Sequence, residues 1–148
     1  MQRIHTEDSA IESEIQAKGK TAPRVTPADI EAAIAREYFF TAGDGADIAR
    51  IRAETPDEAT SFCPASEDPD LSNTDLAPLR LLTFCVLVLR NGFTVTGESA
   101  CASPENFDAE IGRKIARQNA AQKIWPLEGY LLKEKLAFVS IDGRPAAA

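Results

Sequence analysis

The residue types that carry out most protein catalysis are scarce in this chain of 148 residues, which holds one histidine, His5, and three cysteines. A serine or cysteine nucleophile needs an orienting base, and a single histidine close to the start of the chain does not provide one. The cysteines, Cys63, Cys85 and Cys101, form no Cys-x-x-Cys pair, and their odd number is typical of free thiols in a reducing compartment. The sequence therefore predicts no catalytic residue and no enzyme.

Acidic side chains are plentiful, but their spacing does not predict a metal site. An EF-hand loop needs oxygen ligands at fixed positions around an invariant glycine, and the acidic segment does not have that spacing. The carboxylates considered are Asp44, Asp47, Asp57, Glu58, Glu67, Asp68 and Asp70. Closely spaced zinc ligands and glycine-rich phosphate loops are also missing from the sequence. We expect no metal ion and no cofactor.

Binding of a phosphate group is the chemistry that the sequence favours most. Basic side chains gather between residues 113 and 123, although the chain as a whole has a net charge of −7. Arginine forks suit phosphate, aromatic rings suit nucleobases, and a helix N-terminus at Ser103 would attract an anion. The candidate ligand-binding residues are Arg24, Asn106, Phe107, Arg113, Lys114, Arg117, Lys123 and Trp125. Arg113 and Arg117 equally suit an ordinary solvated helix face, and both interpretations stay open.

A β-hairpin and the helix that follows it must position these residues. Asn91-Gly92 lies between two apolar runs and predicts a two-residue type I′ turn. In the resulting register Val88 faces Val95 on one apolar face of the sheet, and Leu87 and Leu89 lie on the other. We expect the N-terminal helix, a third strand or a second copy of the protein to cover Leu87 and Leu89.

The helix after the hairpin is predicted to begin at Ser103-Pro104, a capping residue followed by a proline at the first helical position. Phe107, Ile111 and Ile115 recur at helical spacing and are expected to face the core. Gly112 interrupts this helix, and it indicates either close packing against the hairpin or room for a ligand.

Further helices are predicted on both sides of this unit. One covers about residues 7–18 and ends near Gly19. A second begins with the Thr26-Pro27 cap and ends at the aromatic residues 38–40. Pro126 either breaks the helix before it or begins a new one.

These elements predict the α+β class, with an antiparallel β-hairpin packed against amphipathic helices. Residues 135–141 would supply a third short strand. We expect an N-terminal helix and linker over residues 1–25, and a single α+β domain over residues 26–148. That domain contains an acidic loop insert at about residues 41–78, rich in Pro, Ser, Asp and Glu.

The chain also resembles a family of small tailed-phage and prophage proteins, the phage gene-49/gene-66 family. The resemblance is carried by KGKTAPRVTPADIEAAIAREYFFTA and by FCVLVLRNGFTVTGESACASPENFDAEIGRKIARQNAAQKIWPLEGYLLKEKL. It runs from about Lys18 to Leu136, apart from the insert. The family is similar to the Thoeris anti-defence sponges, which capture cyclic nucleotide immune signals. The resemblance thus implies a phage accessory protein that antagonises host defence by sequestering a phosphate-bearing small molecule, and it brings no catalytic residue.

Two other functions fit the same sequence. The acidic insert could imitate nucleic acid and inhibit a host protein with a basic surface. The apolar hairpin face could instead belong to a phage structural or scaffolding protein. In each case we expect a homo-oligomer formed through the hairpin or the N-terminal helix.

Composition disfavours binding to nucleic acid, insertion into a membrane and secretion. A net charge of −7 disfavours direct nucleic-acid binding, because binding requires neutralisation of phosphates. The longest apolar run, Leu81 to Leu89, is far shorter than the ~20 residues of a membrane-spanning helix. The first residues have no apolar signal-peptide core. We therefore expect no membrane partner, and a location in the cytoplasm of the infected bacterial host.

Overall fold

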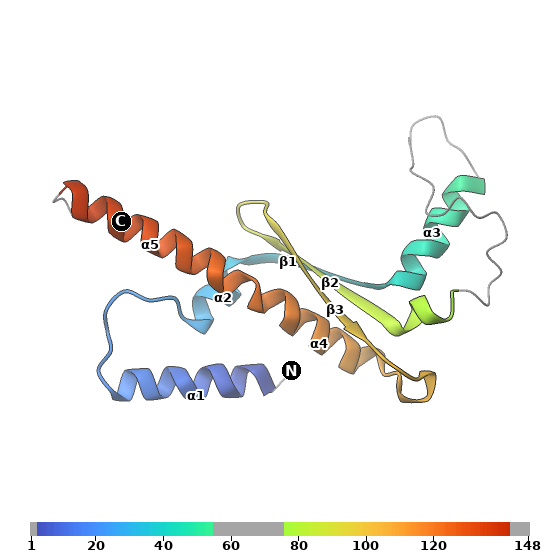
Figure 1. Ribbon diagram of the computed structural model, residues 1–148, viewed down its shortest axis with the longest axis horizontal. Helices are drawn as coiled ribbons and strands as arrows, with labels where there is room; N and C mark the ends of the chain where they lie inside the picture. Colours follow the sequence, from blue (N-terminus) through green and yellow to red (C-terminus); the bar gives the residue numbers. More distant parts are fainter. Residues whose placement is uncertain (1–2, 55–75, 143–148) are drawn as a thin grey trace.

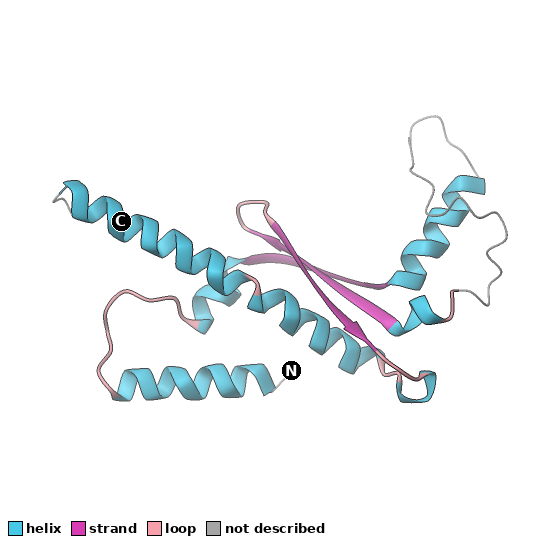
Figure 2. Ribbon diagram, in the orientation of Figure 1, coloured by secondary structure: helices cyan, strands magenta, loops and turns pink. Residues whose placement is uncertain are grey.

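The computed structural model describes residues 3–54 and 76–142 of the chain. An antiparallel sheet in the order β1-β2-β3 is crossed on one face by a helix, α4 (Figure 1). The strands are β1 (Ile34–Thr41), β2 (Leu82–Leu89) and β3 (Thr94–Ala100). The helices are α1 (Arg3–Ala17), α2 (Pro27–Ala33), α3 (Ala42–Glu54), α4 (Ala109–Gln122) and α5 (Ile124–Asp142), with short 3-10 turns η1 (Pro78–Leu81) and η2 (Pro104–Asn106). The predicted α+β class, a hairpin packed against helices, is confirmed (Figure 2).

The hairpin is present, but its predicted register is wrong by one residue. The N–H of Leu89 donates to the carbonyl of Phe93 at 2.8 Å, so the loop has three residues, 90–92, instead of two. Gly92 alone in this loop has a positive φ, of 84°, as in a type I turn followed by a bulge. Leu87 consequently pairs with Val95, and Val88 pairs with Thr94.

This shift decides which face of the sheet is buried, because neighbouring side chains on a strand point to opposite faces. Leu87, Leu89 and Val95 lie together on the face toward α4, which we call the inner face, and all three are buried. Val88, predicted to share a face with Val95, lies on the opposite, outer face. Leu87 and Leu89 are covered by α4 and the start of α5. The covers that were expected, the N-terminal helix, a third strand or a second copy of the protein, were therefore wrong.

The segment from Ile34 to Thr41 is the main element that the sequence analysis misassigned. It was expected to continue the helix that begins at Pro27, but α2 ends at Ala33 and β1 follows at once. β1 pairs antiparallel with β2 along its whole length. Because β2 is apolar on both faces and lies between two strands, the β-branched and aromatic residues of β1 gain more by pairing with it than by continuing the helix.

Small residues, not large ones, form the inward face of α4. Ile111 and Ile115, predicted to face the core, are 56% and 42% exposed. Gly112, Ala116 and Ala120 are buried against the sheet in their place. This choice lets the helix backbone lie directly on the strands.

Two glycines permit that close approach. A Cβ on Gly97 of β3 would overlap the carbonyl oxygen of Ala116 and lie 2.9 Å from the Cα of Ala120. A Cβ on Gly112 would lie 2.9 Å from Oγ1 of Thr83. Of the two interpretations of Gly112, close packing is therefore the one that the structure supports.

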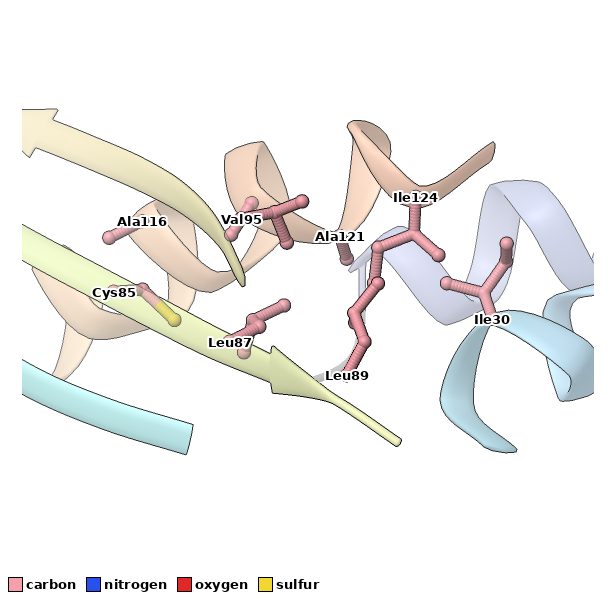
Figure 3. Packing of buried hydrophobic residues seen from close by; sticks show 9 residues of the cluster. Ile30, Cys85, Leu87, Leu89, Val95, Ala116, Ala121 and Ile124 are labelled. Atoms are coloured by element: carbon pink, nitrogen blue, oxygen red, sulfur yellow. The ribbon is translucent and has the colours of Figure 1, made fainter. Parts of the chain in front are cut away.

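The core lies between the inner face, α4 and the junction of α2 with α5 (Figure 3). Leu87, Ile124 and Cys85 are its largest fully buried side chains. Burial raises the pKa of the Cys85 thiol to about 11, so this cysteine stays protonated. Cys85 and Cys101 are both free thiols, as expected.

The capping signals were correct in one case and displaced in another. Thr26 and Asp29 form the predicted capping box at the start of α2. Ser103 makes no side-chain cap. The capping residue of α4 lies five residues later, where Asp108 accepts from the N–H groups of Glu110 and Ile111. An aspartate at this position satisfies two of the otherwise free N–H groups of the helix.

Both ends of the chain contain more helix than expected. Pro126 lies in the first turn of α5, and this helix extends through residues 135–141, which were predicted to form a strand. At the other end α1 ends at Ala17, and Gly19 follows with a φ of 64°. The acidic insert opens with α3, whereas residues 55–75 lie outside the described part of the chain. No helix among the described residues is long and apolar enough to cross a bilayer.

Candidate functional site

Arg117 of α4 is the most heavily bonded basic side chain of the candidate set. Its guanidinium donates to both carboxylate oxygens of Glu31 on α2, at 3.1 and 2.8 Å. It also donates through Nε to Glu37 on β1 at 2.8 Å. One arginine therefore joins α4 to α2 and β1, two consecutive elements that are far from α4 in the sequence.

These bonds keep the Arg117 guanidinium charged and in place. The hydrogen bonds that the guanidinium donates to Glu31, and then those to Glu37, hold the pKa of Arg117 above its ordinary value. Only 16% of the side chain is exposed. A ligand phosphate could bind Arg117 only by competing with two carboxylates, so Arg117 acts mainly as a cross-link.

Arg113 lies one helical turn before Arg117 on the same side of α4. It is exposed, and within the described residues it forms no ion pair or hydrogen bond. Phe39 lies on the same face of β1 as Glu37, because it pairs with the inward-facing Cys85. The edge between α4 and β1 thus includes one uncommitted guanidinium, two carboxylates bound by Arg117, and the half-buried ring of Phe39, which packs against the core.

The start of α4 is less suited to an anion than the sequence indicated. The carboxylate of Asp108 already accepts from the first free N–H groups of the helix. Lys114 pairs with Glu110 at 2.5 Å. Asn106 and Phe107 lie in and just after η2, where Asn106 is exposed and Phe107 is half-buried. Two carboxylates at this end oppose the binding of a phosphate.

Lys123 and Trp125 lie at the junction of α4 with α5. Lys123 is exposed, whereas Trp125 packs against the core beside Ile124. Arg113 is ten residues before Lys123, which corresponds to roughly 15 Å along a helix. These two basic groups therefore cannot hold the same phosphate within one chain.

Arg24 serves a separate contact. Its guanidinium binds both carboxylate oxygens of Glu12 on α1, one of them at 2.5 Å. The hydrogen bonds from Arg24 lower the pKa of Glu12 to about 2. Arg24, predicted to bind a ligand, is thus paired with a carboxylate of the chain itself, which ties α1 to the linker.

Sequence reasoning missed three residues of the α4–β1 edge: Glu31, Glu37 and Phe39. They were assigned to one continuous helix, and no signal in the sequence links them to a residue some 80 positions later. Among the described residues, no cluster of three or more His, Cys, Asp or Glu side chains could hold a metal ion.

Comparison with known proteins assigns the chain to a family. Residues 25–136 match the model of the phage protein (N4 Gp49/phage Sf6 gene 66) family, which is well over half of the chain. The chain belongs to this family. The match takes in α2, the sheet, α4 and most of α5, and it confirms the predicted family. No curated protein and no solved structure matches the chain.

Proposed function

We propose that this member of the phage family is a non-enzymatic accessory protein that binds and sequesters a phosphate-bearing small molecule. The proposed ligand is a cyclic nucleotide immune signal of the host, and its removal would antagonise host defence. Membership of a phage family and the resemblance to anti-defence sponges support this function. The observation that carries it is Arg113, an exposed guanidinium with no partner among the described residues.

The groups along the α4–β1 edge match the parts of a nucleotide. Arg113 offers a planar fork of N–H donors for a phosphate. Phe39 offers an aromatic face, on which a base can stack. Glu37 is anchored by Arg117, and its remaining lone pairs can accept hydrogen bonds from sugar hydroxyls or base amino groups. Binding by donors and acceptors together favours a nucleotide over inorganic phosphate.

Titration calorimetry with a panel of cyclic mono-, di- and trinucleotides tests this proposal. We expect at least one to bind the wild-type protein, and Arg113→Ala to weaken its affinity at least tenfold. Arg90→Ala is the matched control, since Arg90 is also exposed but lies at the tip of the hairpin. An identical loss in both variants would mean that only overall charge matters, and it would contradict a site at Arg113.

Absence of binding by every member of the panel would contradict the proposal as a whole. In that event two functions remain to be tested, inhibition of a host protein through the acidic insert and a structural role in the phage particle. Neutralising Asp44 and Asp47 would weaken capture of a host protein in the first case. Co-purification with virions, unaffected by that change, would indicate the second.

A further inference from the structure

The outer face of the sheet is apolar and incompletely covered. Tyr38 and Phe40 of β1 are 48% and 41% exposed, and Phe84, Val86 and Val88 of β2 are partly exposed beside them. The rings of Phe40 and Phe84 stack with centroids 5.8 Å apart. A sheet that is apolar on both faces is normally covered on both faces. Here the described residues cover the inner face and leave the outer face partly exposed.

The second half of α5 is also apolar, and it has little to pack against. Of its first residues, Ile124 belongs to the core, and Trp125 and Leu127 pack against it. The remainder extends beyond the sheet (Figure 1). Tyr130 is 68% exposed and Phe138 is 63% exposed, and Leu131 and Leu136 are also exposed.

Apolar residues lie on two sides of this helix. Leu131 and Phe138 form one stripe at a spacing of seven residues, and Leu132, Leu136 and Val139 form another. A helix that is apolar on most of its surface is normally buried. The extended part of α5 therefore requires a surface that residues 3–54 and 76–142 do not provide.

The chain cannot use α5 to cover its own outer face. α4 lies on the inner face, where Gly97 and Gly112 hold it in place. A single residue, Lys123, separates α4 from α5, and its backbone angles of −73° and −15° are helical. The direction of α5 is thus set by α4, and it runs away from the sheet on the inner side (Figure 2).

We propose that two copies of the chain associate by exchanging α5, so that each α5 lies on the outer face of its partner's sheet. Each chain carries both surfaces, the outer face and α5. A two-fold symmetric pair therefore contains two identical contacts. At roughly 200 Å² per aromatic side chain, the exposed fractions of Tyr38, Phe40, Tyr130 and Phe138 offer about 400 Å² per copy. That is about half of the ~800 Å² that each partner of a stable complex buries, before any aliphatic side chain is included.

Charge on the two surfaces is compatible with this contact. The strand residues on the outer face include two charges, Arg36 beside Val88 and Glu98 beside Phe84, at diagonally opposite corners. The middle of α5 carries Glu134 between Lys133 and Lys135. The outer face and α5 thus each carry charges of both signs, so neither surface repels the other through a single net sign.

Three variants test the exchange by sedimentation velocity of the full chain. Val86→Glu places a charge on the outer face, and the double change Leu131→Glu with Phe138→Glu does the same on α5. Each is expected to convert a dimeric species to monomers with an unchanged circular dichroism spectrum. Ile111→Glu is the control, because Ile111 is an equally exposed helical residue outside both surfaces, and this variant is expected to associate as the wild type does.

The decisive step is to mix the two monomeric variants. In an exchanged pair the intact α5 of one variant meets the intact outer face of the other, so association is partly restored. A contact between two sheets or between two α5 helices would leave the mixture monomeric, and that result would overturn the proposal. A monomeric wild-type protein, or loss of association in only one of the two variants, would also overturn it. If Val86→Glu fails to fold, Tyr38→Glu on the edge strand replaces it.

Discussion

The two faces of the one sheet are packed in contrasting ways. On the inner face, glycine and alanine let the backbone of α4 rest on the strands, and the contact is complete within a single chain. On the outer face, large aliphatic and aromatic side chains remain partly exposed. The contrast shows that small residues of α4 let it close the inner face over buried core side chains, whereas the large side chains of the outer face are left partly uncovered.

The sharpest way to break the inner contact is Gly97→Ala. The added methyl group would overlap backbone atoms of α4, which cannot move aside as a flexible side chain can. We expect a loss of at least about 3 kcal/mol in the free energy of unfolding, measured by urea denaturation. Gly129→Ala in α5 is the control, because nothing lies near that position, and it should be neutral or stabilising by up to about 1 kcal/mol. A loss below about 1 kcal/mol at Gly97 would mean that the contact is looser than described.

The ion pairs of Arg117 join the inner side of the sheet to α2. Arg117→Met would leave Glu31 and Glu37 without their shared partner, and we expect a loss of about 2 kcal/mol in the free energy of unfolding. Arg113→Met removes an equally long basic side chain that has no such partners, and it should cost less than about 0.5 kcal/mol. Equal losses in thermal or urea unfolding would show that the network adds no specific stability.

The inner face also contains one buried hydroxyl, that of Thr83. Its Oγ1 is buried on the inner face and finds no hydrogen-bond partner among the described residues. Thr83→Val keeps the shape and removes the unpaired hydroxyl, so it should stabilise the protein by up to about 1 kcal/mol. Thr96→Val on the exposed outer face serves as the control and should change stability little. Destabilisation by Thr83→Val would reveal an unrecognised partner for the hydroxyl.

The contact of α1 belongs to neither face, and it should be the weakest and the most sensitive to acid. Because Arg24 lowers the pKa of Glu12 from 4.5 to about 2, this pair contributes at pH values above 4.5 and is lost as the pH falls toward 2. An NMR titration of the Glu12 carboxyl group measures the pKa directly. Arg24→Ala should return it toward 4.5, and an unperturbed value in the wild-type protein would exclude the contact.

The fold class, the hairpin and the Thr26 cap followed from the sequence because each depends on residues close together in the chain. The register did not, because Asn-Gly suits both a two-residue turn and the three-residue loop that forms here. β1 was missed because Ile30, Ala33 and Ile34 happen to recur at helical spacing. The apolar character of β2 on both faces was the one sign that a further strand lies beside it.

The candidate site was harder to predict than the fold. Glu31 and Glu37 lie 86 and 80 residues from Arg117, and no local pattern reports a contact over such distances. Ile111 and Ile115 were predicted to face the core because large apolar residues at helical spacing are usually buried. Gly97 leaves room for a helix backbone, so small residues of α4 face the sheet in place of the isoleucines. This can be seen only once the pairing of the strands is known.

Native mass spectrometry of the full chain, purified under mild conditions from a host that makes the immune signal, tests the account most directly. We predict an even-numbered oligomer that carries a nucleotide-sized adduct, and an Arg113→Ala variant that keeps the oligomer and loses the adduct. An oligomer without an adduct would contradict the sequestering function while leaving the exchange of α5 intact. A monomer without an adduct would contradict both.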